Sequence, residues 1–234
     1  MIFAALLAGG KGTRLGNLDK PKQFLELNDK AIIIHTLEKF LLFDEFEKIL
    51  ILVPKNWINY TKDIIKKEGF DDNKIIVLEG GKLRNDTIMK SIDYIIKNYE
   101  VDEDDILLTH DSVRPFVSYR IIKENINLIN KYDICNTVIP ATDTIVESKD
   151  GKIISHIPDR SHMYMGQTPQ TFKLLKFKRY YDKLNDSQKE ILTDATKIFI
   201  LNNEDVALIR GEVTNIKITY ISDLKIAKMM INNL

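Results

Sequence analysis

The chain has 234 residues, of which 44% are hydrophobic and 29% are charged. This composition is typical of a globular protein and excludes a disordered, collagen-like or coiled-coil chain. Lys plus Arg equals Asp plus Glu at 34 each, so no basic surplus attracts nucleic acid or a membrane, and neither is an expected partner. The single cysteine permits no internal disulfide, which favours a cytoplasmic location.

Short apolar runs rich in Ile, Leu and Val alternate with longer stretches of helical period, as parallel strands alternate with covering helices. The first run ends at Gly9, before a membrane span or signal sequence could form, and predicts a buried strand. The predicted strands are Ile2–Leu7, Lys48–Val53, Lys74–Leu78, Asp105–Thr109 and Cys135–Ile139. The predicted helices are Ile33–Phe43, Asn56–Glu68, Asn85–Lys97 and Tyr119–Asn130.

The pattern changes between residues 140 and 160. Two β-like runs, Thr142–Val146 and Ile153–Ile157, flank a turn near Gly151 and predict a projecting hairpin. An isolated hairpin is marginally stable in water, so we expect a second copy of the chain to cover it in a homodimer. Beyond this arm the pattern predicts helices Leu174–Leu184, Asp194–Leu201 and Ser222–Asn232, and strands Val206–Ile209 and Ile216–Thr219.

These elements predict a Rossmann-like, doubly wound, mostly parallel α/β sheet. We expect a single domain over residues 1–234, with the arm at about 140–160. In such sheets ligands bind beyond the carboxyl ends of the strands, so the loops after Leu7, Leu78 and Thr109 should face one crevice.

The loop after the first strand is glycine-rich and basic. It reads Leu7-Ala8-Gly9-Gly10-Lys11-Gly12-Thr13-Arg14-Leu15-Gly16, followed by Lys20-Pro21-Lys22-Gln23. Glycines let backbone amides approach phosphate oxygens, and the cations add charge, so the loop predicts a polyphosphate site. No Gly-Lys pair precedes Ser or Thr, which excludes a Walker loop, and Leu15 breaks the dinucleotide fingerprint. A plain tight turn with solvated cations is the alternative.

Three further positions carry candidate chemistry. The segment Gly80–Thr87 joins a glycine pair to a helix N-terminus, which suits the edge of a base, although Asp86 or Thr87 could serve only as a cap. Asp111 follows a buried strand, and its carboxylate suits Mg²⁺, with a simple turn as the alternative. Lys217 lies in an otherwise apolar run and is expected to face an anion.

These motifs resemble those of the nucleotidyltransferases that activate sugar or polyol phosphates. Leu7-Ala8-Gly9-Gly10, Arg14 and Pro21-Lys22-Gln23 resemble specifically the cytidylyltransferase branch, and the resemblance extends over essentially the whole chain. It implies the nucleotide-diphospho-sugar transferase type of fold and transfer of CMP from CTP to a polyol phosphate, with release of pyrophosphate. In that reaction Arg14, Lys22 and Lys217 would stabilise the reacting phosphate, and Asp111 would hold Mg²⁺.

The resemblance also implies binding residues. Those for the nucleotide are Leu7, Ala8, Gly9, Gly10, Gly81, Lys82, Leu83, Arg84, Asn85, Asp86, Thr87 and Ser112. Those for the acceptor are Arg114, Thr144, Arg160, Thr193 and Lys217. Thr144 and Arg160 lie on the arm, which in this family crosses to the partner subunit, so arm exchange is expected. Without the resemblance, Arg160 is interpreted as a surface residue.

The acceptor is predicted from local resemblance alone. The segments Arg84–Met89, Thr109–Phe116 and Tyr164–Gln170 look more like the ribitol 5-phosphate enzymes of teichoic-acid and capsule assembly. Methylerythritol phosphate enzymes usually carry an aspartate two residues before the asparagine of Asn-Ile-Lys, and the neighbouring Thr214 departs from their pattern. D-ribitol 5-phosphate, giving CDP-ribitol, is therefore the first expected acceptor and 2-C-methyl-D-erythritol 4-phosphate the second. A non-catalytic nucleotide-binding protein is the alternative of another class.

Overall fold

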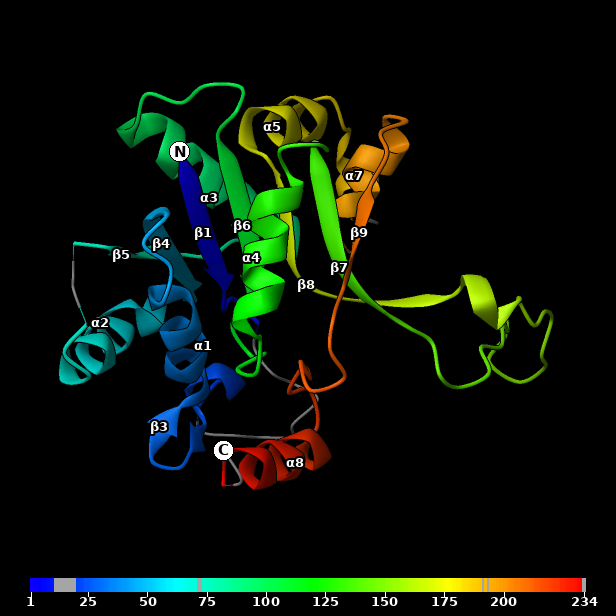
Figure 1. Ribbon diagram of the computed structural model, residues 1–234, viewed down its shortest axis with the longest axis horizontal. Helices are drawn as coiled ribbons and strands as arrows, with labels where there is room; N and C mark the ends of the chain where they lie inside the picture. The colour runs from blue at the N-terminus through cyan, green and yellow to red at the C-terminus, as the bar shows by residue number, and fades with distance from the viewer. Residues whose placement is uncertain (11–19, 71–72, 191, 193, 233–234) are drawn as a thin grey trace.

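The computed structural model describes residues 1–10, 20–70, 73–190, 192 and 194–232. In this part of the chain a seven-stranded sheet has the order β5-β4-β1-β6-β8-β7-β9, with helices on both faces (Figure 1). Its strands are β1 (Ile2–Leu7), β4 (Phe46–Val53), β5 (Ile75–Glu79), β6 (Ile106–Asp111), β7 (Ile134–Pro140), β8 (Tyr164–Lys173) and β9 (Ala207–Arg210).

Helices of varied length connect and cover these strands. They are α1 (Ile32–Leu41), α2 (Ile58–Lys67), α3 (Arg84–Asn98), α4 (Tyr119–Leu128), α5 (Leu174–Asp182), α6 (Asp186–Glu190), α7 (Thr196–Leu201) and α8 (Ile221–Ile231). Short 3-10 turns are η2 (Lys22–Phe24), η3 (Lys55–Trp57) and η4 (Arg160–His162), and a small hairpin joins β2 (Glu26–Leu27) to β3 (Lys30–Ala31). Within the described part, no helix has the length and apolar character needed to cross a membrane.

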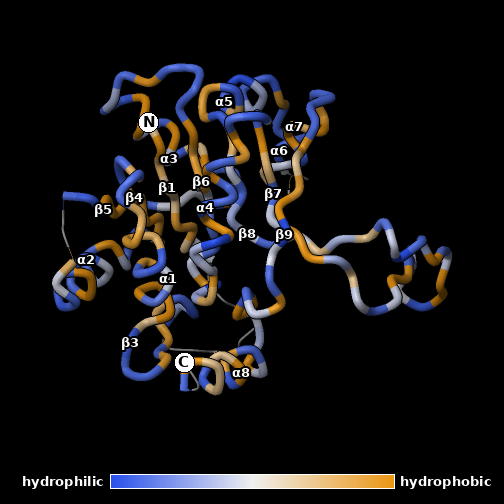
Figure 2. The backbone as a smooth tube through the Cα atoms, viewed as in Figure 1, coloured by the Kyte–Doolittle hydropathy of each residue, from blue (hydrophilic) through white to orange (hydrophobic). Residues whose placement is uncertain are grey.

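Strand β1 is buried on both of its faces. Ala4 and Leu6 belong to the core under α1, α2 and α4, whereas Phe3 and Ala5 belong to the core under α3, α5 and α7. Successive strand residues point to opposite faces, so a strand between two helical layers must be apolar throughout. Figure 2 shows this continuous hydrophobic stretch along β1.

The predicted fold class is confirmed. The strands predicted as far as Cys135–Ile139, and the helices predicted between them, are present, with ends that differ by at most two residues. Strands β5, β4, β1 and β6 pair in parallel. The carboxyl ends of β1 and β6 therefore lie at one edge of the sheet, where Leu7 is the register partner of Asp111.

Strand β8 was not predicted. It runs antiparallel between β6 and β7, and the segment Tyr164–Gln170, quoted from the sequence only for its family resemblance, lies inside it. Gly166 and Pro169 are residue types depleted in strands, and buried polar residues hide the alternation that marks a strand. Because β8 runs antiparallel to both of its neighbours, the sheet is mostly parallel rather than wholly parallel.

The predicted strand Ile216–Thr219 is wrong, because residues 211–219 form a loop without regular structure. The predicted arm is present and projects away from the sheet (Figure 1), but its two β-like runs form no strands. Only an isolated bridge joins Glu147 to His156 in this arm. The exposed fractions of Ile153 and Ile154 are 71% and 56%, so no core of the same chain supports strand pairing there.

Replacing Phe172 tests whether β8 anchors the second core. Its side chain is fully buried and stacks on Phe177 with ring centroids 4.4 Å apart. Phe172→Ala should lower the free energy of unfolding by about 3–5 kcal/mol, measured by urea denaturation. Leu208→Ala on β9 is the control, since that side chain is 54% exposed and should change stability by about 0.5 kcal/mol or less. Equal effects of the two substitutions would contradict this packing.

Candidate active site

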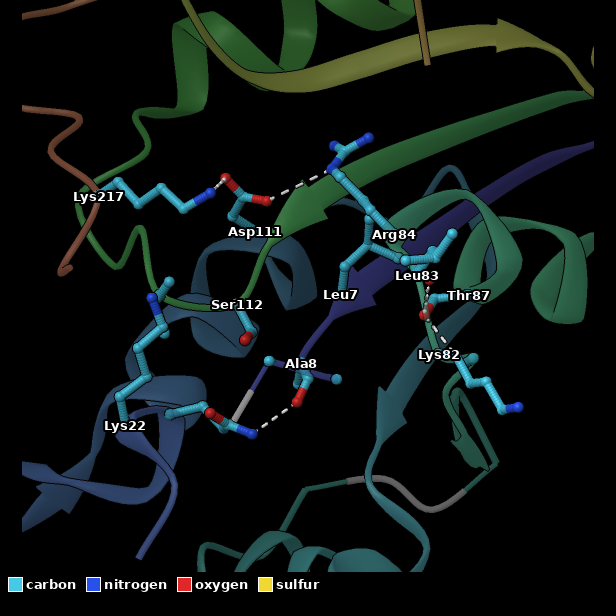
Figure 3. Close-up of a pocket in the computed structure, with 15 residues that line it drawn as sticks. Leu7, Ala8, Lys22, Lys82, Leu83, Arg84, Thr87, Asp111, Ser112 and Lys217 are labelled. Carbon is cyan, nitrogen blue, oxygen red and sulfur yellow. Dashed lines mark hydrogen bonds and ion pairs between the residues drawn. The ribbon is translucent and has the colours of Figure 1, made fainter. Parts of the chain in front are cut away.

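A cleft of about 240 Å³ opens at the carboxyl edge of the sheet. Strand β1 delivers Leu7, β6 delivers Asp111, and the turn after β5 leads into α3 (Figure 3). The backbone ladder continues past the strands, because Ala8 N donates to Leu52 O and Ser112 N donates to Leu7 O. The lining residues are Leu7, Ala8, Gly9, Gly10, Lys22, Gln23, Gly81, Lys82, Leu83, Arg84, Thr87, Asp111, Ser112, Val113 and Lys217.

Two glycine pairs pack against each other at the floor of this cleft. A Cβ on Gly9 would lie 3.8 Å from the carbonyl oxygen of Gly81. A Cβ on Gly81 would lie 2.4 Å from the Cβ of Asp86, so no larger residue fits there. The close approach leaves backbone rather than side chain facing the cavity, as the sequence predicts. Arg14 lies within residues 11–19, outside the described part of the chain.

The start of α3 is held by side-chain caps. The backbone N–H of Leu83 donates to Asp86 Oδ2 at 3.0 Å, and Gly81 N donates to Thr87 Oγ1 at 2.9 Å. Asp86 also accepts a bond from the hydroxyl of Tyr181, and it is not one of the residues that line the cleft. The buried Asn85 likewise does not line the cleft, and its amide donates to Leu192 O. Of the polar residues predicted here, Lys82, Arg84 and Thr87 reach the cavity.

The electrostatic centre of the cleft is the Asp111 carboxylate, which is buried among three described cations. Its Oδ2 lies 3.0 Å from Lys217 Nζ and 3.3 Å from Arg114 Nε, and its Oδ1 lies 3.8 Å from Arg84 Nε (Figure 3 shows Lys217 and Arg84). Burial raises the pKa of the Asp111 carboxyl, but the charges of Arg84, Lys217 and Arg114 outweigh it and hold the pKa well below its usual range. This group therefore carries surplus positive charge that favours a polyanion.

Lys22 also lines the cleft. It opens the 3-10 turn η2, and its Nζ donates to Ile218 O at 3.0 Å. The neighbouring Gln23 is buried, and its amide donates to Ala8 O at 2.6 Å, which fixes η2 to the end of β1. Sequence reasoning quoted Gln23 in a motif but assigned it no role. The available signal in the sequence was an amide residue directly after Lys22, and its burial is visible only in the structure.

His110 has a packing and hydrogen-bonding role. Burial lowers its pKa to about 4, so the ring is neutral near pH 7. Its Nε2 lies 3.1 Å from Arg114 O, and its Nδ1 lies 3.0 Å from Thr168 Oγ1. The same Thr168 hydroxyl accepts a bond from Asp111 N. The ring thus fixes the turn that carries Asp111.

The predicted acceptor residues are not gathered in one cleft of a single chain. Arg114 is buried, and its Nη1 donates to Asn215 O at 2.7 Å, so it supports the loop around Asn215 and does not line the cavity. Arg160 and Thr144 lie on the exposed arm, where Arg160 donates to Thr142 O. Thr193 lies outside the described residues. Lys217 is the predicted acceptor residue that lines the cleft.

The residues present fit a magnesium ion that arrives with phosphates. Among the described residues, Asp111 is the sole carboxylate lining the cleft, and no cluster of three or more His, Cys, Asp or Glu could hold a metal. Mg²⁺ is commonly bound by one or two carboxylates together with substrate phosphates. Asp111 supplies one such hard ligand beside a cavity able to admit a polyphosphate.

Comparisons with known proteins agree with this geometry. A model of the 2-C-methyl-D-erythritol 4-phosphate cytidylyltransferase family matches residues 2–233. The 4-diphosphocytidyl-2C-methyl-D-erythritol synthase of Anaerococcus prevotii is 26% identical, with a TM-score of 0.81 over 99% of this chain and 96% of that one. The 2-C-methyl-D-erythritol 4-phosphate cytidylyltransferase of Francisella tularensis is 24% identical, with a TM-score of 0.81 over 97% and 98%.

A third similar structure is the 2-C-methyl-D-erythritol 4-phosphate cytidylyltransferase of Thermus thermophilus, which is 22% identical. Its TM-score is 0.73, with 98% of each chain covered. The predicted enzyme class is confirmed, and the non-catalytic alternative is set aside. Because the family model spans nearly all of its residues, the chain belongs to the 2-C-methyl-D-erythritol 4-phosphate cytidylyltransferase family and is a nucleotidyltransferase.

Proposed function

We propose that this cytidylyltransferase joins CMP from CTP to the phosphate of a polyol phosphate, with Lys22 and Lys217 acting on the reacting α-phosphate. The observation that carries the proposal is the surplus of positive charge around Asp111 in a cleft that Lys22 also lines and whose floor is glycine backbone. Such a site suits a triphosphate, whose negative charge needs cations and whose approach needs unobstructed amides.

2-C-methyl-D-erythritol 4-phosphate is the acceptor that the comparisons favour, because the matching family and the similar structures carry its name. D-ribitol 5-phosphate, the first expectation from sequence, becomes the second candidate. Its support is the local resemblance of three segments and the departure at Thr214. Thr214 borders a groove beside Phe116 and does not line the cleft, which weakens its part in that argument.

In the proposed reaction a phosphate oxygen of the acceptor attacks the α-phosphorus of CTP, and the bond from that phosphorus to the pyrophosphate oxygen breaks. No nucleophilic side chain is needed, because in-line phosphoryl chemistry depends on positioning and on charge stabilisation. Lys22, Lys217 and Arg14 would stabilise the charge that gathers on the reacting phosphate. Asp111 would hold Mg²⁺, whose charge would offset that of the phosphates.

Lys217 must change partners in this reaction. In the free enzyme its ammonium is paired with Asp111 Oδ2 at 3.0 Å. A triphosphate offers competing oxygens, so the ammonium of Lys217 would turn from Asp111 to the phosphates as the nucleotide enters. The side chain of Lys217 is 39% exposed and can therefore move without unpacking the core.

We also propose that a second copy of the chain completes the acceptor site. Arg160 and Thr144 are on the arm, which projects away from the cleft of its own chain (Figure 1). The arm exposes the large apolar side chains Ile153, Ile154 and Ile157, which a partner subunit would cover. Arg160 of one copy would then bind the acceptor phosphate in the cleft of the other.

Pyrophosphate release measured with CTP, Mg²⁺ and each acceptor separately tests the substrate assignment. We expect turnover with 2-C-methyl-D-erythritol 4-phosphate to exceed that with D-ribitol 5-phosphate. The reverse order would assign the enzyme to ribitol 5-phosphate. Absence of turnover with both acceptors would contradict the polyol phosphate proposal.

Substitution of Lys22 tests the charge role. Lys22→Ala should lower turnover about a hundredfold or more, the scale of losing one preorganised charge contact. Lys62→Ala, an exposed lysine on α2, is the matched control and should keep full turnover. Turnover of Lys22→Ala equal to that of the control would remove Lys22 from the mechanism.

Substitution of Asp111 tests both metal binding and charge pairing. Asp111→Asn leaves three described cations without their carboxylate, so the metal-free protein should lose about 1–3 kcal/mol of stability, discounted for the partial exposure of Lys217. Chemical denaturation in the presence of a chelator measures this loss. The variant should also bind Mg²⁺-CTP no more tightly than metal-free CTP. A variant as stable as the parent and still metal-dependent would refute both roles.

A further inference from the structure

The loop formed by residues 211–219 carries Lys217 without regular secondary structure. At its two ends, Gly211 N donates to Val138 O, and Ile218 N donates to Val113 O. Between them, the described backbone bonds are local, from Asn215 N to Glu212 O and from Ile216 N to Thr214 O. After Lys217 the loop is held at Ile218, whose N–H donates to Val113 O and whose carbonyl accepts a bond from Lys22 Nζ. Before Lys217 the local bonds shape a turn but do not attach it to the sheet, so on that side the attachment is made by side chains.

Asn215 makes the attachment. Its side chain is fully buried, and its Nδ2 donates to Thr168 O at 2.9 Å and to Gln167 Oε1 at 3.3 Å, both on β8. Its own carbonyl accepts a bond from Arg114 Nη1 at 2.7 Å. The amide group therefore joins the Lys217 loop to strand β8, while its backbone meets a cation that also contacts Asp111.

Gln167 supports the same attachment. Its Nε2 donates to Glu212 O at 2.9 Å, at the start of the loop. A Cβ on Gly211 would lie 2.4 Å from Gln167 Oε1, so a larger residue there would displace the Gln167 amide. Two adjacent residues of β8 thus bind the loop, one through a side chain and the other through a carbonyl oxygen.

Thr168 links both members of the Asp111–Lys217 ion pair. Its hydroxyl accepts a bond from Asp111 N at 3.1 Å, and its carbonyl oxygen accepts the bond from Asn215, two residues before Lys217. Strand β8 therefore binds both the residue that carries the carboxylate and the loop that carries the ammonium. A shift of the Asn215 amide would move the ammonium relative to the carboxylate.

We propose that Asn215 is a positioning residue, whose buried amide on β8 sets Lys217 against Asp111 and so against the reacting phosphate of CTP. The inference rests on the proposed role of Lys217. The amide orientation is unambiguous, because both groups facing Nδ2 are acceptors. Its Oδ1 is buried without a hydrogen-bond partner among the described residues. That arrangement costs stability and fits a residue whose value lies in placing the loop.

The test compares Asn215→Ala with Asn125→Ala. Asn125 is equally buried, and its side-chain amide bonds to Thr137 and Thr171, away from the cleft. Asn215→Ala should lower kcat about 10–100-fold, the scale of a small misplacement of a reacting group. Its thermal unfolding midpoint should fall no further than that of the control. Asn125→Ala should keep its kcat. A stability loss in Asn215→Ala with kcat intact would overturn the inference.

A double-mutant cycle with Lys217→Ala shows whether Asn215 acts through Lys217. In the Lys217→Ala background, Asn215→Ala should change kcat by less than about twofold, because coupled residues are non-additive. If the fold-changes in kcat of the two single substitutions multiply in the double variant, the inference is overturned. If Lys217→Ala leaves turnover unchanged, the proposed role of Lys217 fails, and this inference fails with it. If Lys217→Ala is impaired and Asn215→Ala is not, only this inference fails.

Two further measurements keep the test decisive. The same cycle on the Kd for Mg²⁺-CTP, measured by calorimetry, needs no acceptor and should show the same non-additivity. Should Asn215→Ala not fold, Gln167→Met carries the test, since it keeps volume but removes the bonds to Glu212 and Asn215. Gln167→Met should also lower kcat, and an unchanged kcat would overturn the inference.

Discussion

The ion cluster around Asp111 is the constraint on which the rest of the cleft depends. A buried carboxylate is tolerated only when cations and hydrogen bonds compensate it. Here three described cations surround it, so the group keeps positive charge that the carboxylate alone does not balance. A polyphosphate supplies the missing negative charge. The same cluster therefore explains both how the buried carboxylate is tolerated and why the cleft suits a nucleotide.

The sheet brings these charges together from distant parts of the chain. Strands buried on both faces have a register fixed by their side chains, so Leu7 and Asp111 end at the same level. Antiparallel β8 then brings polar groups to this edge, where Thr168 and Gln167 bind the loop of Lys217 through Asn215 and Glu212. Rigid strands thus position a loop that has no regular structure of its own.

Local patterns predicted the parallel half of the fold well, because β1 and β4 are continuous apolar runs between amphipathic helices. They failed for β8, whose glycine, proline and buried polar residues do not look like a strand. They also failed for residues 216–219, where alternating Ile216 and Ile218 suggested a strand. That segment is held by the bonds of Ile218 to Val113 and Lys22, and the preceding Asn215 bonds to β8. No local pattern encodes these contacts.

The candidate site was likewise predicted in part. The loops after Leu7 and Thr109, which carry Lys22 and Asp111, were predicted to face one crevice, because strand ends of a parallel sheet meet at one edge. Lys217 was assigned to the same site by the family resemblance. The buried contact of Arg114 with Asn215 depends on residues far apart in sequence and was not foreseen. Acceptor choice is harder still, because similar polyol phosphates differ by only about 1–3 kcal/mol in such a pocket.

The account depends on cations that act directly on the phosphates of CTP. A crystal structure of the enzyme with CTP and Mg²⁺ is the most direct measurement of that claim. The account predicts Lys22 Nζ and Lys217 Nζ within hydrogen-bond distance of α-phosphate oxygens, with Lys217 released from Asp111 and the carboxylate facing the metal. A bound nucleotide with both lysines turned away from its phosphates would contradict it.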